Sequence, residues 1–148
     1  MAIRKGWSID PIEINTPELN DLLNKIEWNN FPASYNNLDR VPKLPGIYIF
    51  SAIKKIDSFG KEKSLETPIY IGISTHSIYS RYKDHRTKPW FDKCYKSFHN
   101  NFSYSFVTTE NEDLDRIALE KLETILINAF GPVVNDKRSY TGDGIRAQ

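Results

Sequence analysis

Residues 46–50, Gly-Ile-Tyr-Ile-Phe, and residues 69–73, Ile-Tyr-Ile-Gly-Ile, are two short runs rich in β-branched and aromatic side chains. These residue types favour extended chain, so each run predicts a β-strand. Because side chains alternate between the two faces of a strand, Tyr48 and Tyr70 each point away from their neighbouring isoleucines. If the two strands pair as a hairpin, the isoleucines share a buried face and both tyrosines lie on the other face.

The other segments predict several helices and one further strand. Alternation of Phe102, Tyr104 and Phe106 with polar serines indicates a strand. Proline and hydroxyl positions then predict three helices: one after Asn15-Thr16-Pro17, one from Thr75 to His85 or Arg86, and one from Pro89 to Phe98. The segments 29–45 and 52–67 are rich in polar residues and turn formers, so we expect a loop or extended arm over 29–45 and a long loop over 52–67.

The last helix has the clearest pattern. Thr109 and Glu112 have the spacing of a capping box, and apolar residues then recur at helical spacing. Gly131-Pro132 is a typical helix end.

Length and cysteine content limit the class of protein. A chain of 148 residues suits one domain with a sizeable core, and the single cysteine, Cys94, excludes an intrachain disulfide. The first residues lack the apolar core of a secretion signal, and no apolar run approaches the ~20 residues of a membrane span. We therefore expect a cytoplasmic protein with no membrane partner. Paired cysteines for zinc and a glycine-rich phosphate loop are both missing from the sequence.

Charge is distributed unevenly along the chain. The net charge is only +1, but residues 41–109 hold 11 basic and 5 acidic side chains, a net of +6. A basic segment of this kind suits a polyanion such as nucleic acid. A solvated, lysine-rich surface explains this feature equally well when it is taken alone.

Arg81 and His85 are four residues apart and so share one face of a helix. The planar donors of Arg81 suit a phosphate, and His85 can hold or pass a proton near neutral pH. Taken alone, the pair more often means a solvent-facing arginine beside a structural histidine.

Two polar residues stand out near the end of the chain. Glu123 lies in an apolar stretch of the last helix, where a half-buried carboxylate needs a partner that can be a cation. The alternative is a glutamate at the rim of the core that reaches water. Asn135 follows the Gly-Pro break, where an asparagine commonly holds a turn.

In this order and spacing, these residues resemble the GIY-YIG nuclease family. The match comprises Gly46-Ile47-Tyr48, Tyr70-Ile71-Gly72, Arg81 with His85, Glu123, and Asn135 twelve residues later, and it spans residues 45–135 of the 148. The stretch between the two triplets is longer than the family usually has. We interpret residues 52–67 as an insertion at a hairpin tip or as a DNA-contacting loop that carries Lys54, Lys55, Lys61 and Lys63.

The resemblance implies an α+β fold with a small three-stranded antiparallel sheet flanked by helices. It divides the chain into an N-terminal helix and arm (1–44), a nuclease domain (45–136) and a C-terminal tail (137–148). The implied activity is a divalent-metal-dependent endonuclease that hydrolyses phosphodiester bonds, most readily in DNA, with RNA still open. Restriction, homing and repair-type nicking are all compatible with this activity.

The resemblance also implies a role for each residue of the motif. Glu123 would bind Mg²⁺ or Mn²⁺, Arg81 the scissile phosphate, Tyr70 the proton of the attacking water, and Tyr48 the water itself. His85 would position Tyr48 or the phosphate, or assist proton transfer, and Asn135 would fix the region around Glu123. The expected nucleic-acid contacts are Gly72, Lys83, Arg86 and Lys88.

Three alternatives to a monomeric nuclease remain open at this point. A domain of the same fold could bind nucleic acid without cutting it. A protein-interaction module could use the aromatic residues of the N-terminal arm. A homodimer would supply the second active site that a double-strand break requires.

Overall fold

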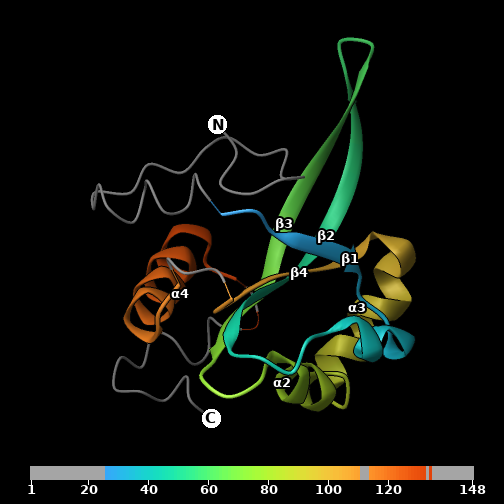
Figure 1. Cartoon of the computed structure of the whole chain (residues 1–148). Helices are drawn as coiled ribbons and strands as arrows, with labels where there is room; N and C mark the ends of the chain where they lie inside the picture. The colour runs from blue at the N-terminus through green and yellow to red at the C-terminus, as the bar shows by residue number, and fades with distance from the viewer. Residues whose placement is uncertain (1–25, 111–113, 133, 135–148) are drawn as a thin grey trace.

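A computed structural model of the chain describes residues 26–110, 114–132 and 134. In these residues a four-stranded antiparallel sheet has the order β1-β4-β2-β3, with helices on both of its faces (Figure 1). The predicted α+β class is therefore confirmed. The strands are β1 (Asn29–Pro32), β2 (Gly46–Ser58), β3 (Lys61–Ser74) and β4 (Phe102–Thr108). The helices are α2 (Ile78–His85), α3 (Pro89–Phe98) and α4 (Arg116–Phe130), with short 3₁₀ helices η1 (Tyr35–Arg40) and η2 (His99–Asn101).

The sheet separates two cores. Ile47, Ile49 and Ile71 face the buried side of α4 and pack against its leucines. Tyr48, Phe50 and Tyr70 face the opposite side, where they pack against α2, α3 and the rings of β4. The expected alternation thus sorts Ile47, Ile49 and Ile71 from the aromatic side chains of the two central strands. Ile69 is the exception, because it lies at the register shift and packs in the aromatic core with Tyr70.

The sheet has four strands, so the expected count of three was wrong. The additional strand β1 pairs Asn29 with Phe106 and Pro32 with Ser103 at the edge of the sheet. Its sequence, Asn-Asn-Phe-Pro, has one buried side chain, Phe31, and no apolar alternation. Proline is tolerated because an edge strand leaves one row of backbone groups unpaired. The surrounding segment 29–45, expected as a loop or extended arm, also contains η1.

The expected loop 52–67 is instead the outer part of a long hairpin. Strands β2 and β3 run on to Ser58 and Lys61, which pair with each other and leave Phe59 and Gly60 as the turn. Figure 1 shows this hairpin projecting away from the helices. Its polar composition hid the strands, because a hairpin that no helix covers has no apolar face to reveal its period.

Helix α4 begins later than the capping-box pattern predicts. Its N-cap is Asp115, whose carboxylate accepts a hydrogen bond from the Ala118 backbone N–H at 2.8 Å. Thr109 instead follows the end of β4 directly, and its N–H donates to the Pro45 carbonyl oxygen. The predicted end is confirmed, with Gly131 in the left-handed conformation and its N–H donating to the Ile127 carbonyl oxygen.

The N-terminal helix expected after Pro17, Asn135 and the C-terminal tail lie outside the described residues. Within the described residues, no helix combines the length and the apolar character that crossing a membrane requires.

The two faces of α4 provide a stability test of this architecture. Leu122 is fully buried, whereas Ile117 on the same helix is 63% exposed. We expect Leu122→Ala to lower the free energy of unfolding by about 2–5 kcal/mol because it leaves a cavity. The control Ile117→Ala should change it by less than about 0.5 kcal/mol. Urea denaturation measures both values, and equal losses would show that α4 does not dock through the Leu122 face.

Candidate active site

Tyr48 and Tyr70 lie side by side on the aromatic face of the sheet. Tyr48 pairs with Gly72 across β2 and β3, and Phe50 pairs with Tyr70. The two tyrosine rings are stacked, with centroids 6.1 Å apart and planes within 8° of each other. Their exposed fractions are 0% and 3%, so both rings belong to the core as well as to the candidate site.

Gly72 makes room for both tyrosines. A Cβ atom at this position would lie 2.6 Å from the Tyr48 hydroxyl oxygen and 2.8 Å from the Tyr70 ring. Gly72 is also one of the expected nucleic-acid contacts. In the structure the two tyrosine rings occupy the space where its side chain would lie, so glycine at this position is required by packing.

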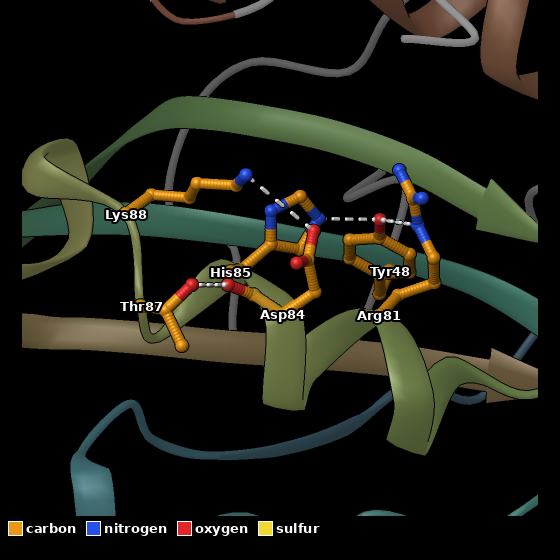
Figure 2. A network of polar contacts seen from close by, with 6 residues as sticks. All are labelled: Tyr48, Arg81, Asp84, His85, Thr87 and Lys88. Atoms are coloured by element: carbon orange, nitrogen blue, oxygen red, sulfur yellow. Dashed lines mark hydrogen bonds and ion pairs between the residues drawn. The ribbon is translucent and has the colours of Figure 1, made fainter.

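Helix α2 supplies the two polar partners of Tyr48. It begins at Ile78 with Ser77 as N-cap, two residues after the expected Thr75, and Ser77 accepts a hydrogen bond from the Ser80 N–H. Arg81 and His85 then lie one turn apart on the face toward the sheet. His85 Nε2 is 2.7 Å from the Tyr48 hydroxyl oxygen, and Arg81 Nε is 3.5 Å from the same atom (Figure 2).

The donors and acceptors around Tyr48 define a direction for its proton. An arginine side chain has only donors, so Arg81 donates to the Tyr48 hydroxyl oxygen. The hydroxyl proton can then be donated to Nε2 of a neutral His85 that carries its own proton on Nδ1. This tautomer is inferred from the hydrogen-bond network.

Burial controls the protonation of this group. Desolvation raises the pKa of Tyr48 and the neighbouring Tyr70 raises it further, while Arg81 acts in the opposite direction. Burial alone would lower the pKa of Arg81, but Tyr48 and Tyr70 raise it, and the net direction is upward. Near neutral pH the site therefore combines a protonated Tyr48 hydroxyl with a charged guanidinium.

Trp90 completes the aromatic surroundings of the site and was missed from the sequence. Its ring is parallel to Tyr70 at 5.6 Å and lies 5.4 Å from His85, which is itself 4.4 Å from Tyr70. Pro89 at the first turn of α3 was the available signal, because it starts the helix and sets Trp90 in the first turn.

Glu123 lies on α4, which packs on the aliphatic face of the sheet rather than on the tyrosine face. It is 5% exposed, although its side chain is ionisable. Strand β3 is at the edge of the sheet, and α4 packs against it, so this edge is where a bound molecule could reach both faces.

The donor set around Glu123 suits only an open metal site. Within the described residues, no group of three or more histidine, cysteine, aspartate or glutamate side chains could hold a metal. Mg²⁺ keeps several waters and is often held by one or two carboxylates together with substrate phosphate. A single buried carboxylate therefore fits a site that the substrate completes, and does not fit a closed structural site.

The basic residues expected to contact nucleic acid differ in their surroundings. Arg86 donates to the Tyr35 carbonyl oxygen at 2.8 Å, so it holds α2 against η1. Lys88 forms an exposed ion pair with Asp84 at 3.9 Å (Figure 2). Lys83 is exposed at the surface of α2.

No family model, curated protein or solved structure matches this chain. Function is therefore inferred from the residues of the site and their geometry. The structure brings together Tyr48, Tyr70, Gly72, Arg81 and His85, and it sets Glu123 on the other face of the same two strands.

The close approach at Gly72 predicts a sharp cost for any side chain there. Gly72→Ala should lower the free energy of unfolding by about 1–3 kcal/mol, because the added methyl group displaces the Tyr48 hydroxyl and the Tyr70 ring. In a Tyr48→Ala background the same substitution should cost less, since one of the two clashing rings is gone. A double-mutant cycle by urea denaturation measures this coupling. Additive effects would show that the contact with Tyr48 is unimportant.

Burial of Tyr48 predicts loss of stability in alkali. Its pKa in the folded chain is raised above the unfolded value of ~10. The protonated Tyr48 hydroxyl therefore contributes to the free energy of unfolding. This contribution is fully present below pH ~10 and falls by about 1.4 kcal/mol per pH unit as pH rises further. Burial also raises the pKa of Tyr82 to about 12, so Tyr82 adds to the same loss of stability. Tyr82 is still present in the Tyr48→Phe variant. Unfolding free energies from pH 8 to 11 should therefore fall less steeply in Tyr48→Phe than in wild type, and parallel curves would contradict this.

Proposed function

We propose that this chain is a divalent-metal-dependent endonuclease that cuts phosphodiester bonds, with DNA as its substrate. One observation carries the proposal: the buried Tyr48 hydroxyl lies 2.7 Å from His85 Nε2 and 3.5 Å from Arg81 Nε, beside Tyr70. Orienting a buried hydroxyl with both a histidine and an arginine costs desolvation of all three groups. Such a constellation is more useful for phosphate chemistry than for stability.

Arg81 is the residue suited to the scissile phosphate. It is half-buried and remains charged, and it bonds Tyr70 as well as the Tyr48 hydroxyl. Because a guanidinium has five N–H donors, donors remain for phosphate oxygens. Its charge would stabilise the negative charge that develops as the phosphodiester bond breaks.

Tyr48 and His85 act on the attacking water in this proposal. Because its pKa is raised, Tyr48 keeps its proton and orients the water through its hydroxyl rather than acting as the base. His85 fixes the rotation of that hydroxyl through Nε2. Tyr70, whose ring lies 4.4 Å from the His85 ring, takes the proton of the water, directly as the phenolate or through a relay.

Glu123 would hold the metal ion, Mg²⁺ or Mn²⁺, at the β3 edge of the sheet. When bound there, the ion supplies positive charge to the phosphate and to the leaving oxygen. The single carboxylate is consistent with an ion that shares its remaining positions with water and substrate.

Binding without cutting is the second candidate function. It is favoured by the burial of Tyr48 and Tyr70, which are 0% and 3% exposed, because water must reach both hydroxyls for hydrolysis. A domain of this kind would keep the affinity for nucleic acid and lack metal-dependent turnover.

Glu123 and Glu120 provide a matched test on one helix. Glu123→Gln should reduce Mg²⁺-dependent nicking of supercoiled plasmid by at least about 100-fold, because an amide binds the cation poorly. Glu120→Gln should nick at the wild-type rate, since Glu120 is exposed and its ion pair with Arg116, at 3.5 Å, contributes at most about 1 kcal/mol.

Three controls make the result decisive. A chelator should stop nicking by wild type, and both variants should unfold cooperatively. The same assay on an RNA of equal length compares the two nucleic acids. Equal nicking by the two glutamine variants would exclude Glu123 as the metal ligand, and no nicking by wild type with Mg²⁺ or Mn²⁺ would favour the binding domain.

A further inference from the structure

The outer part of the β2–β3 hairpin, residues 51–68, has no role in the site described so far. We call it the hairpin extension. It begins at a register shift, where Phe50 pairs with Tyr70 but Ser51 pairs with Pro68, so that Ile69 is an additional residue in β3. From there the two strands pair without interruption to Ser58 and Lys61, and Figure 1 shows them leaving the body of the molecule together.

Cross-strand pairing assigns each charged side chain of the hairpin extension to a face, because paired residues point to the same side. Lys54 pairs with Leu65 and Ile56 pairs with Lys63. The face that carries Lys54 and Lys63 also carries Lys61, and we call it the basic face. The opposite face, which we call the acidic face, carries Lys55, Asp57, Glu62 and Glu66. One face therefore carries three positive charges and no negative charge, while the other has a net charge of −2.

The observed ion pairs agree with this division. Lys55 lies 3.8 Å from Glu62, and both belong to the acidic face. In the described part of the chain, none of the three lysines of the basic face forms an ion pair. All three are exposed, so their charge is available to a partner.

The basic face continues the tyrosine face of the sheet. Tyr48, Phe50, Ala52 and Lys54 alternate on one side of β2, and Ala52 packs against the aromatic core that contains Tyr48. An open cavity of about 720 Å³ lies at the root of the hairpin extension, and its lining includes Lys54, Lys55 and Trp90. Because Trp90 also stacks on Tyr70, a ligand at the active site can continue along this face without crossing the sheet.

The tip of the hairpin presents an aromatic ring in an unfavourable backbone conformation. Phe59 and Gly60 have φ values of 54° and 76°, the signs that a type I′ turn requires, and Phe59 is 103% exposed. Asn-Gly and Gly-Gly are the usual choices there, since other residues adopt this conformation at a cost. A fully exposed phenylalanine ring at such a position contributes nothing to the stability of the fold.

We propose that the hairpin extension lies along duplex DNA, with Lys54, Lys61 and Lys63 on the phosphate backbone and Phe59 inserted between two base pairs. Apolar wedges of this kind unstack and kink duplexes in DNA-binding proteins. The proposal rests on the proposed function, because it takes the substrate of the active site as its occupant. Positive charge on the face continuous with that site selects a polyanion.

The length of β2 predicts how far the DNA kink at Phe59 lies from the cleaved phosphate. Phe59 is eleven residues after Tyr48 in the sequence, which at a rise of about 3.3 Å per residue is about 36 Å. One turn of duplex DNA is about 34–36 Å. The wedge should therefore act about one helical turn from the phosphate that Arg81 binds.

Neighbouring lysines provide the matched binding test. Lys54→Ser and Lys55→Ser remove the same charge from adjacent exposed positions on opposite faces. Affinity for a fluorescein-labelled 30-base-pair duplex is measured by anisotropy from 50 to 300 mM NaCl. Lys54→Ser should weaken binding and reduce the slope of log K against log[NaCl] by about one, and the triple serine variant of the basic face should reduce it by about two to three. Lys55→Ser should leave both values near wild type.

Phe59→Asn tests the wedge without disturbing the turn, because asparagine suits the left-handed conformation. Wild type should increase the fluorescence of a 2-aminopurine placed about one helical turn from the cut, since unstacking relieves its quenching. Phe59→Asn should lose this increase and should melt at the same temperature as wild type or higher. An unchanged fluorescence response in Phe59→Asn would overturn the wedge.

The outcomes separate this proposal from the proposed function. If wild type nicks plasmid but the Lys54 and Lys55 variants bind DNA alike, the hairpin proposal is wrong and the nuclease proposal survives. If wild type binds through the basic face and never nicks, the nuclease proposal fails and the hairpin proposal survives. The triple serine variant could also lose self-association in sedimentation while its DNA binding stays unchanged. That result would identify the basic face as a contact between two copies of the chain and would overturn the hairpin proposal. Tighter binding to duplex RNA than to DNA would overturn the choice of DNA.

Discussion

The contact between Tyr48 and Gly72 is the constraint on which the candidate site depends. The Tyr48 ring lies over the one position of β3 where a side chain would collide with it. Only this register sets its hydroxyl within reach of both Arg81 and His85 on α2. A slip of one residue would turn Tyr48 into the aliphatic core under α4 and the isoleucines into the aromatic core, so hydrophobic sorting and site geometry select the same register.

Dense aromatic packing gives that hydroxyl a fixed place. Phe50 and Tyr104 lie on one side of Tyr48 and Tyr70 stacks on it, while His85 approaches from α2. Rings packed in this way have few alternative rotamers, which holds the polar atoms of a site in a narrow range of positions. The same packing raises the pKa of Tyr48 by excluding water. Rigidity and proton retention at Tyr48 therefore have one physical cause.

The sequence predicts the centre of this fold better than its edges. Isoleucine alternation identifies the central part of β2 and β3 because two cores cover them, and Gly131 marks the end of α4 because its backbone conformation favours glycine. Strand β1 escaped prediction because its pairing with β4 gives it stability that its own polar residues do not. Trp90 escaped because Pro89 indicates only that a helix begins there, whereas the contact of Trp90 with Tyr70 depends on how two distant elements pack.

The register shift at Ile69 links the site to the hairpin extension. Without that additional residue, Glu62 and Glu66 would share the face of Tyr70 and Gly72, and Lys61 and Lys63 would lie on the opposite face. One inserted residue exchanges the two sets, because side chains alternate with a period of two. The bulge thereby brings Lys61 and Lys63 onto the surface that already carries the tyrosines, Trp90 and Lys54. Charge sorting of this kind depends on pairing between residues distant along the chain, and no inspection of residues 52–67 alone can reveal it.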